Sequence, residues 1–109
     1  MTELNKIRCV GCEGGIPALT KDEIQTFMPQ VKDWQVSSDS QWLTRKFSFP
    51  DFYHTMAFVN AVAWISHQEN HHPDMEVGYN YCQMKYSTHA VNGLTQNDFI
   101  CAAKVNTLS

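Results

Sequence analysis

The sequence contains neither a surplus of basic residues nor a long apolar run. Lys and Arg number 8 against 11 Asp and Glu, a formal net charge of −3, so no basic field is available to bind nucleic acid or an acidic membrane. No stretch of about 18 apolar residues is present to span a bilayer, and the start of the chain lacks the apolar segment of a signal peptide. We therefore expect a soluble, cytoplasmic protein that binds no nucleic acid and no membrane.

The chain also lacks the cysteine pattern of a disulfide-stabilised protein. Its cysteines are Cys9, Cys12, Cys82 and Cys101. They are too scattered for a disulfide framework in a reducing compartment. Cys9 and Cys12 have the spacing of half a zinc knuckle, but no second CxxC or CxxH pair follows nearby, and the βαβ setting of a redox motif is missing. We interpret residues 1–18 as an N-terminal arm, mobile in the simplest case, before a folded domain over residues 19–109.

What is present suits one globular domain with a core. Apolar residues make up 43% of the chain and aromatic residues 12%. Capping boxes at Thr20 and Thr95 open a first and a last helix, and an apolar helical pattern begins at Phe52. Alternating residues predict strands at 34–36, 42–49, 75–77 and 82–89. The order α-β-β-α-β-β-α predicts a single-domain α+β fold, with a four-stranded antiparallel sheet and helices packed on one face.

The helix that begins at Phe52 is apolar on more than one side, at least as far as Ile65. A single sheet covers only one face of a helix, so the remaining apolar residues need a second cover. We therefore predict a homodimer or homotetramer in which this helix, or the sheet edge beside it, is partly buried between subunits.

Histidines are concentrated in one stretch, where four of the five lie between His67 and His89. His67 and His71 have the spacing that binds zinc on a helix, and His89 could be a third ligand, but His72 would then have no role. Proton transfer is an alternative, because a free imidazole titrates near pH ~6.5. The residues alone leave metal binding, proton transfer and ordinary surface rings open. His54 stands alone, and we interpret it as structural or surface-exposed.

The proline after the histidine pair predicts where the rings lie. A residue before proline is displaced from the helical region, so His72, which precedes Pro73, should be the first extended residue. His71 should then lie near the last turn of the preceding helix, whose dipole favours a positive charge. His89 should end the last strand, facing the same pocket.

Three motifs together resemble the pterin-4a-carbinolamine dehydratases. They are His71-His72-Pro73, then Ser87-Thr88-His89, then Gly93-Leu94-Thr95 followed by Asp98. The resemblance covers most of the chain from Thr20 onward. The front part, Cys9 to Cys12 followed by Pro17-Ala18-Leu19, resembles the bacterial branch of the family.

This resemblance implies a hydro-lyase that uses no metal and no cofactor. The family removes water from 4a-hydroxytetrahydrobiopterin, the spent cofactor of aromatic amino acid hydroxylases such as phenylalanine hydroxylase, and so regenerates quinonoid dihydropterin. The implied catalytic residues are His71, His72 and His89. The implied substrate-binding residues are Asn70, His71, His72, Pro73, Ser87, Thr88, His89 and Ala90, with His67 and Asp98 in support.

Two departures and two alternatives accompany the resemblance. Where animal members have a tryptophan after His-His-Pro and an acidic residue, this chain has Met75. Some family members have a glutamate where this chain has His67, and Glu69 would face elsewhere on a helix. Animal members also bind a transcription factor, so a non-catalytic interaction or coactivator module is an alternative function. A pterin-binding protein of molybdopterin metabolism is another.

Overall fold

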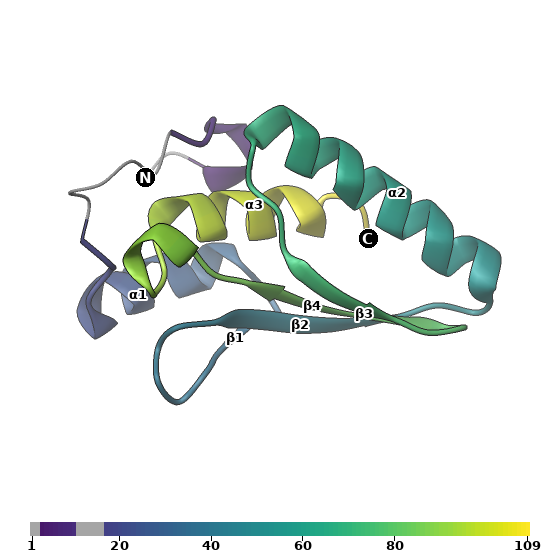
Figure 1. Cartoon of the computed structure of the whole chain (residues 1–109), viewed down its shortest axis with the longest axis horizontal. Coiled ribbons are helices and arrows are strands. Elements are labelled where there is room, and N and C mark those ends of the chain that lie inside the picture. The colour runs from purple at the N-terminus through teal and green to yellow at the C-terminus, as the bar shows by residue number, and fades with distance from the viewer. Residues whose placement is uncertain (1–2, 11–16) are drawn as a thin grey trace.

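The computed structural model describes residues 3–10 and 17–109, which form helices and strands arranged as in Figure 1. The α-helices are α1 (Lys21–Phe27), α2 (Phe52–Glu69) and α3 (Gln96–Asn106). The strands are β1 (Gln35–Val36), β2 (Leu43–Ser48), β3 (Asp74–Val77) and β4 (Tyr81–Tyr86). Short 3₁₀ turns are η1 (Leu4–Lys6), η2 (Met28–Gln30) and η3 (His89–Val91). None of the described helices combines the length and the apolarity needed to cross a bilayer.

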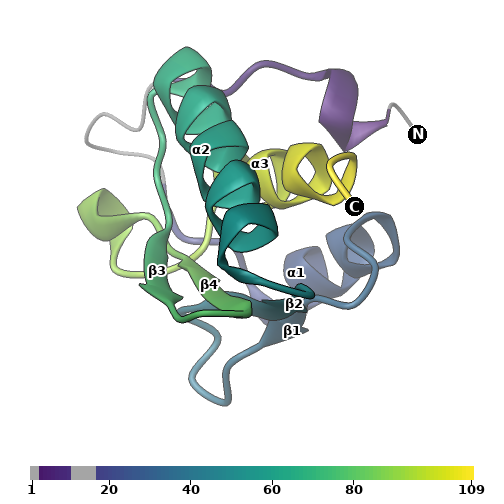
Figure 2. The same ribbon diagram turned by 90° about the vertical axis from the view of Figure 1, so that its right-hand side faces the viewer.

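The four strands form one antiparallel sheet in the order β1-β2-β4-β3. Side chains alternate between its two faces, so Leu43, Phe47 and Met84 point into the core, while Lys46 and Lys85 face solvent. Helices α2 and α3 lie on the same side of the sheet in both views (Figures 1 and 2). The predicted α+β fold, with its helices on one face, is confirmed.

Helix α3 lies at the centre of the core. It begins at the predicted capping box, in which Thr95 is the N-cap and Asp98 its reciprocal partner. Helix α2 and both turns η1 and η2 contact it, and Phe99, Cys101 and Val105 are fully buried as a result. A helix covered on so many sides holds its first turn, including Asp98, in a fixed position.

The described part of the N-terminal segment, residues 3–10, packs against α3, which differs from the mobile arm that we expected. Leu4 is only 2% exposed, and its N–H donates to Gln30 Oε1 at 2.8 Å. Lys104 of α3 donates to the carbonyl of Asn5 at 3.1 Å. These partners lie 26 and 99 residues away in the sequence, so no local pattern indicates the packing. Of the CxxC motif, Cys12 lies outside the described residues.

Helix α2 ends two residues before His71, earlier than we predicted. Asn70 takes the left-handed conformation, with φ of 51°, and the N–H groups of both Asn70 and His71 bond the carbonyl of Ser66. This is the usual way in which a left-handed residue closes a helix, with Asn in place of Gly. Because His71 lies outside the helix, His67 and His71 do not share a helical face.

Candidate active site

Two loops at one end of the sheet bring the predicted site residues together. The first loop, residues 70–73, follows α2, and the second, residues 87–90, follows β4. They enclose a pocket of about 200 Å³ lined by Asn70, His71, His72, Ser87, Thr88, His89 and Ala90. These are seven of the eight residues that we expected to bind substrate. Pro73 is buried and does not line the pocket.

His71 is the most firmly held of the three rings. Its Nε2 lies 2.6 Å from Asp98 Oδ1, and since a carboxylate only accepts, Nε2 carries the proton of this bond. The ring stacks on Tyr86 with a centroid distance of 5.8 Å and an interplanar angle of 8°. Burial raises the pKa of the Tyr86 hydroxyl well above its usual range, so Tyr86 is a neutral wall. In a neutral His71 ring, Nδ1 is then the nitrogen left to accept a proton.

Asp98 serves both the helix and the histidine. Its side chain is fully buried, and its Oδ2 accepts from the N–H of Thr95 at 3.0 Å and from the hydroxyl of Thr88 at 2.7 Å. Its Oδ1 is thereby turned toward His71. The capping box that starts α3 therefore also sets the orientation and the tautomer of a pocket histidine, as buried carboxylates do in other histidine sites.

His72 is anchored by its other nitrogen. Its Nδ1 lies 3.2 Å from the carbonyl oxygen of Pro73, which only accepts, so Nδ1 is the protonated nitrogen. When the ring is neutral, Nε2 is free to take a proton. His71 and His72 are adjacent in the chain but present opposite ring nitrogens to their anchors.

His89 does not end a strand, contrary to our prediction. Strand β4 stops at Tyr86, and the chain returns through an isolated bridge between Thr88 and Gly93, whose intervening residues include η3. The turn closes because Asn92 adopts the left-handed conformation, with φ of 52°. Within the described part of the chain, the His89 ring has no hydrogen-bond partner.

An aromatic residue directly before β2 contacts the His89 ring. Trp42 meets it edge to face at a centroid distance of 6.2 Å, and Lys85 lies over the indole at 4.2 Å. Trp42 and the Tyr86 wall were not among the predicted site residues. In the sequence both fit the alternation of a strand, which gives no sign of a contact with a histidine.

Two residues that the sequence placed near the cluster face elsewhere. His67 is exposed and stacks on Trp64 at 5.5 Å, so the structure does not bring it to the pocket. Glu69 is 8% exposed and forms ion pairs with Arg8 at 3.2 Å and Lys104 at 3.7 Å. Its charge is therefore used to hold the N-terminal segment.

The fifth histidine, His54, is part of a helix cap. Asp51 accepts from its backbone N–H at 2.9 Å and from its Nδ1 at 2.8 Å, at the start of α2. These two bonds lower the pKa of the Asp51 carboxyl. The structural role that we expected for His54 agrees with this position.

The arrangement of the pocket is one that could carry out proton transfer. Among residues 3–10 and 17–109, no three His, Cys, Asp or Glu side chains are grouped so that they could hold a metal ion. The three imidazoles instead surround one space, and two of them have a defined tautomer. Such an arrangement can donate a proton from one ring and accept a proton on another.

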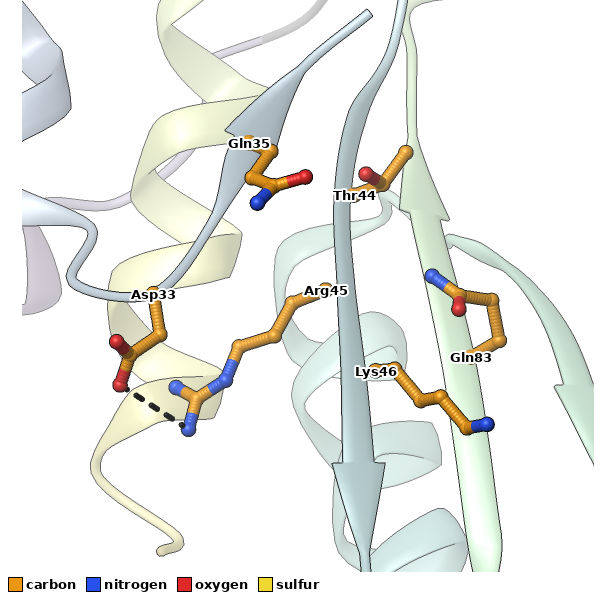
Figure 3. A pocket seen from close by; sticks show the side chains of 6 residues that line it. All are labelled: Asp33, Gln35, Thr44, Arg45, Lys46 and Gln83. Atoms are coloured by element: carbon orange, nitrogen blue, oxygen red, sulfur yellow. Dashed lines mark ion pairs between the residues drawn. The ribbon is translucent and has the colours of Figure 1, made fainter.

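A larger hollow of about 550 Å³ lies on the open face of the sheet, as Figure 3 shows. It is lined by Asp33, Gln35, Thr44, Arg45, Lys46 and Gln83. Arg45 and Asp33 form an ion pair across 3.7 Å. None of the six side chains is a histidine, whereas the smaller pocket is lined by three, so we take the smaller pocket as the candidate active site.

Comparison with known families and curated proteins agrees with the geometry. A profile of the family described as "Pterin 4 alpha carbinolamine dehydratase" matches residues 17–108. A relative from Legionella pneumophila is 54% identical over 108 residues, which cover 98% of this chain and 96% of the relative. A relative from Nitrosomonas eutropha is 56% identical over 102 residues, covering 93% and 88%. Both are provisionally named pterin-4-alpha-carbinolamine dehydratase.

Two solved structures share the fold. A transcriptional coactivator/pterin dehydratase from Brucella melitensis superposes with a TM-score of 0.79 at 30% identity, covering 84% of this chain and 97% of that one. A pterin dehydratase-like protein identified as a RuBisCO assembly factor in the alpha-carboxysome gives 0.62 at 22% identity, covering 72% and 92%. The second likeness shows the fold alone.

Proposed function

The chain belongs to the pterin-4-alpha-carbinolamine dehydratase family, and we propose that it removes water from a 4a-hydroxytetrahydropterin by histidine acid/base catalysis. One observation supports this most directly. Three imidazoles from two loops line one pocket, and the two adjacent rings are anchored through opposite nitrogens. The product, quinonoid dihydropterin, is the form that serves an aromatic amino acid hydroxylase after reduction.

The reaction needs one proton donor and one proton acceptor. The donor protonates the 4a-hydroxyl, the bond from C4a to oxygen breaks, and water leaves. The acceptor takes a proton from a ring nitrogen, so that no net proton is consumed. Each such transfer contributes roughly 10²–10⁴-fold to the rate. We assign these transfers to His72 and His89. We assign to His71, which Asp98 fixes with Nδ1 as an acceptor, the holding of the substrate by a hydrogen bond that Nδ1 accepts.

The size of the pocket suits the ring rather than the tail of the substrate. Its volume of about 200 Å³ lies below the roughly 300–1,000 Å³ of pockets that enclose a whole drug-sized ligand. The flat pterin would therefore enter by one edge, where backbone groups of residues 87–90 can hydrogen-bond it. We infer that the substituent on the pterin extends beyond the histidines and contributes little to the chemistry.

Dehydratase activity is the direct test. Purified protein should accelerate the loss of water from a chemically generated 4a-hydroxytetrahydropterin, followed by absorbance, and turnover should be unchanged after exhaustive chelation because the histidines act without a metal ion. No acceleration over the uncatalysed reaction would refute the proposed function. Activity that disappears on chelation and returns with stoichiometric zinc would instead support the metal alternative.

We also propose that the protein is a homodimer or homotetramer. Helix α2 exposes Phe52, Tyr53 and Trp64, at 46%, 81% and 60% of their surfaces. The edge strand β3 exposes Met75 and Val77 at 37% and 40%. Large apolar side chains gathered on one helix and the edge of one sheet are typical of surfaces that associate.

Light scattering at micromolar concentration should therefore give at least twice the monomer mass of 12.5 kDa. Replacing the exposed Trp64 by lysine should shift the population toward smaller species if α2 forms the contact. An unchanged mass in this variant would indicate that the subunits associate through the sheet edge instead of α2. A wild-type monomer would contradict the assembly altogether.

A further inference from the structure

Folding brings two cysteines that are 92 residues apart into contact behind the histidine pocket. Cys9 Sγ lies 3.6 Å from Cys101 Sγ. Cys101 is fully buried within α3, whereas Cys9 is partly exposed and lines a hollow of about 250 Å³ that His71 also lines. The pair is thus reachable from one side only, through Cys9.

Several hydrogen bonds hold Cys9 in this position. Its backbone N–H donates to Glu69 Oε1 at 2.7 Å, and its thiol lies 3.7 Å from the carbonyl of Asn97. The next residue, Val10, bonds the side-chain amide of Asn97 in both directions, at 3.1 Å and 2.6 Å. Asn97 lies one turn before Cys101 in α3. Its bonds to Cys9 and Val10 therefore hold the Cys9 sulfur next to the Cys101 sulfur.

We propose that Cys9 and Cys101 are a redox pair, which a low-molecular-weight disulfide such as oxidised glutathione converts into an intrachain disulfide that fastens residues 3–10 to α3. The Cys9 thiolate attacks one sulfur of the oxidant and releases one thiol equivalent, leaving a mixed disulfide on Cys9. Cys101 then loses its proton, attacks Cys9 Sγ and displaces the second thiol. Two protein thiols are oxidised by two electrons, and one small disulfide is reduced to two thiols.

The surroundings of the two sulfurs give them different roles. The hydrogen bond with Cys9, together with burial, raises the pKa of the Cys101 thiol well above its usual range. Cys101 therefore stays protonated until the mixed disulfide is next to it, and Cys9 is the entry point for the oxidant. A disulfide bond is about 2.05 Å long, so the segment that carries Cys9 must move toward α3 by roughly 1.5 Å.

The consequence of oxidation is a restrained N-terminal segment. A cross-link between residues 92 apart removes much of the freedom of the unfolded chain, which predicts a rise in Tm of roughly 5–20 °C on oxidation. Cys9 also donates its backbone N–H to Glu69, which ends α2. The disulfide would therefore restrain Glu69 and the start of the loop that carries His71. This proposal does not depend on the proposed function.

The full chain, equilibrated with oxidised glutathione and digested with trypsin without reduction, provides the test. Cleavage after Arg8, Lys21, Lys85 and Lys104 separates residues 9–21 from residues 86–104. We expect these two peptides to be joined, two free thiols to be lost, and Tm to rise by the amount above. The link should persist in Cys12→Ser and in the matched control Cys82→Ala, and it should be lost in Cys9→Ala and in Cys101→Ala.

Three results would overturn the proposal. A disulfide within residues 9–21, with Cys101 free, would make the CxxC motif the redox pair. Loss of the peptide link in Cys12→Ser would assign the bond to Cys12. Glutathione on Cys9 without a cross-link would show that the sulfurs cannot close. Cys101→Ala removes a buried side chain and could fail to fold. Cys9 is partly exposed, so Cys9→Ala should fold and still tests whether the link needs Cys9.

Discussion

Replacing His72 or His89 with alanine should lower turnover of a 4a-hydroxytetrahydropterin by roughly 10²-fold or more. Each ring lines the pocket, and each is assigned a proton transfer that occurs only in the transition state. His72 has its Nδ1 committed to the Pro73 carbonyl, so its Nε2 is the reactive nitrogen. The measurement is kcat under saturating substrate, with folding checked by circular dichroism.

The matched control is His54→Ala, which removes an exposed ring that bonds Asp51 at the start of α2. Its kcat and KM should be close to those of the wild type. If His72 and His89 act as an acid–base pair, the double alanine variant should be little slower than either single variant, because their effects are not additive. Near-wild-type turnover in a folded single variant would remove that residue from the mechanism.

His71→Ala should differ in kind from these two. Asp98 holds the ring through Nε2, so Nδ1 of His71 is placed to accept a hydrogen bond from the substrate and hold it in the pocket. We therefore expect slower turnover together with a larger rise in KM than in the other variants. A pure loss of kcat with unchanged KM would instead place His71 among the proton-transfer groups.

Local sequence signals were sufficient for most of the fold. The capping boxes at Thr20 and Thr95 both form, because they depend only on residues three positions apart. The predicted ends of α2 and β4 were wrong because they depend on more than neighbouring residues. Asn70 and Asn92 both adopt the left-handed conformation, which a glycine in the sequence indicates far more clearly than an asparagine does. The conformation of Asn92 also depends on the bridge between Thr88 and Gly93.

Less of the candidate site could be obtained from the residues alone. Histidine spacing left metal binding and proton transfer open, and resemblance to a family selected the pocket residues. The structure adds partners that lie far apart in the sequence, such as Asp98 with His71 and Cys9 with Cys101, separated by 27 and 92 residues. Such contacts arise when α3 packs into the core, and the local spacing of residues does not predict them. Asp98 was expected near the site only because of the resemblance to the family.

Asp98→Asn should lower kcat/KM by roughly 10–10²-fold while the protein still folds. Thr95 N–H and the Thr88 hydroxyl both bond Oδ2, so the oxygen of the asparagine must take this position. The NH₂ group then faces Nε2 of His71 and donates to it, which forces the ring proton onto Nδ1. The nitrogen left for the substrate becomes a donor instead of an acceptor, the same tautomer error that a neutral partner causes in a catalytic triad.

Alanine at this position is a less informative change. Asp98 is fully buried, and its removal would leave three donors without an acceptor, at a cost of about 1–3 kcal/mol for each buried group. The sum is comparable with the whole stability of a small domain, so Asp98→Ala should unfold or nearly unfold the protein. Loss of activity in that variant would therefore say nothing about catalysis.

Two controls separate orientation of His71 from capping of α3. Glu23→Gln changes the equivalent residue of the capping box of α1, which does not line the pocket, and should leave kcat/KM unchanged. Because Asp98 acts through His71, the double variant Asp98→Asn with His71→Ala should be no slower than His71→Ala alone. Ring ¹⁵N shifts should place the His71 proton on Nε2 in the wild type and on Nδ1 in Asp98→Asn. Unchanged shifts, or fully additive losses in the double variant, would show that Asp98 does no more than cap its helix.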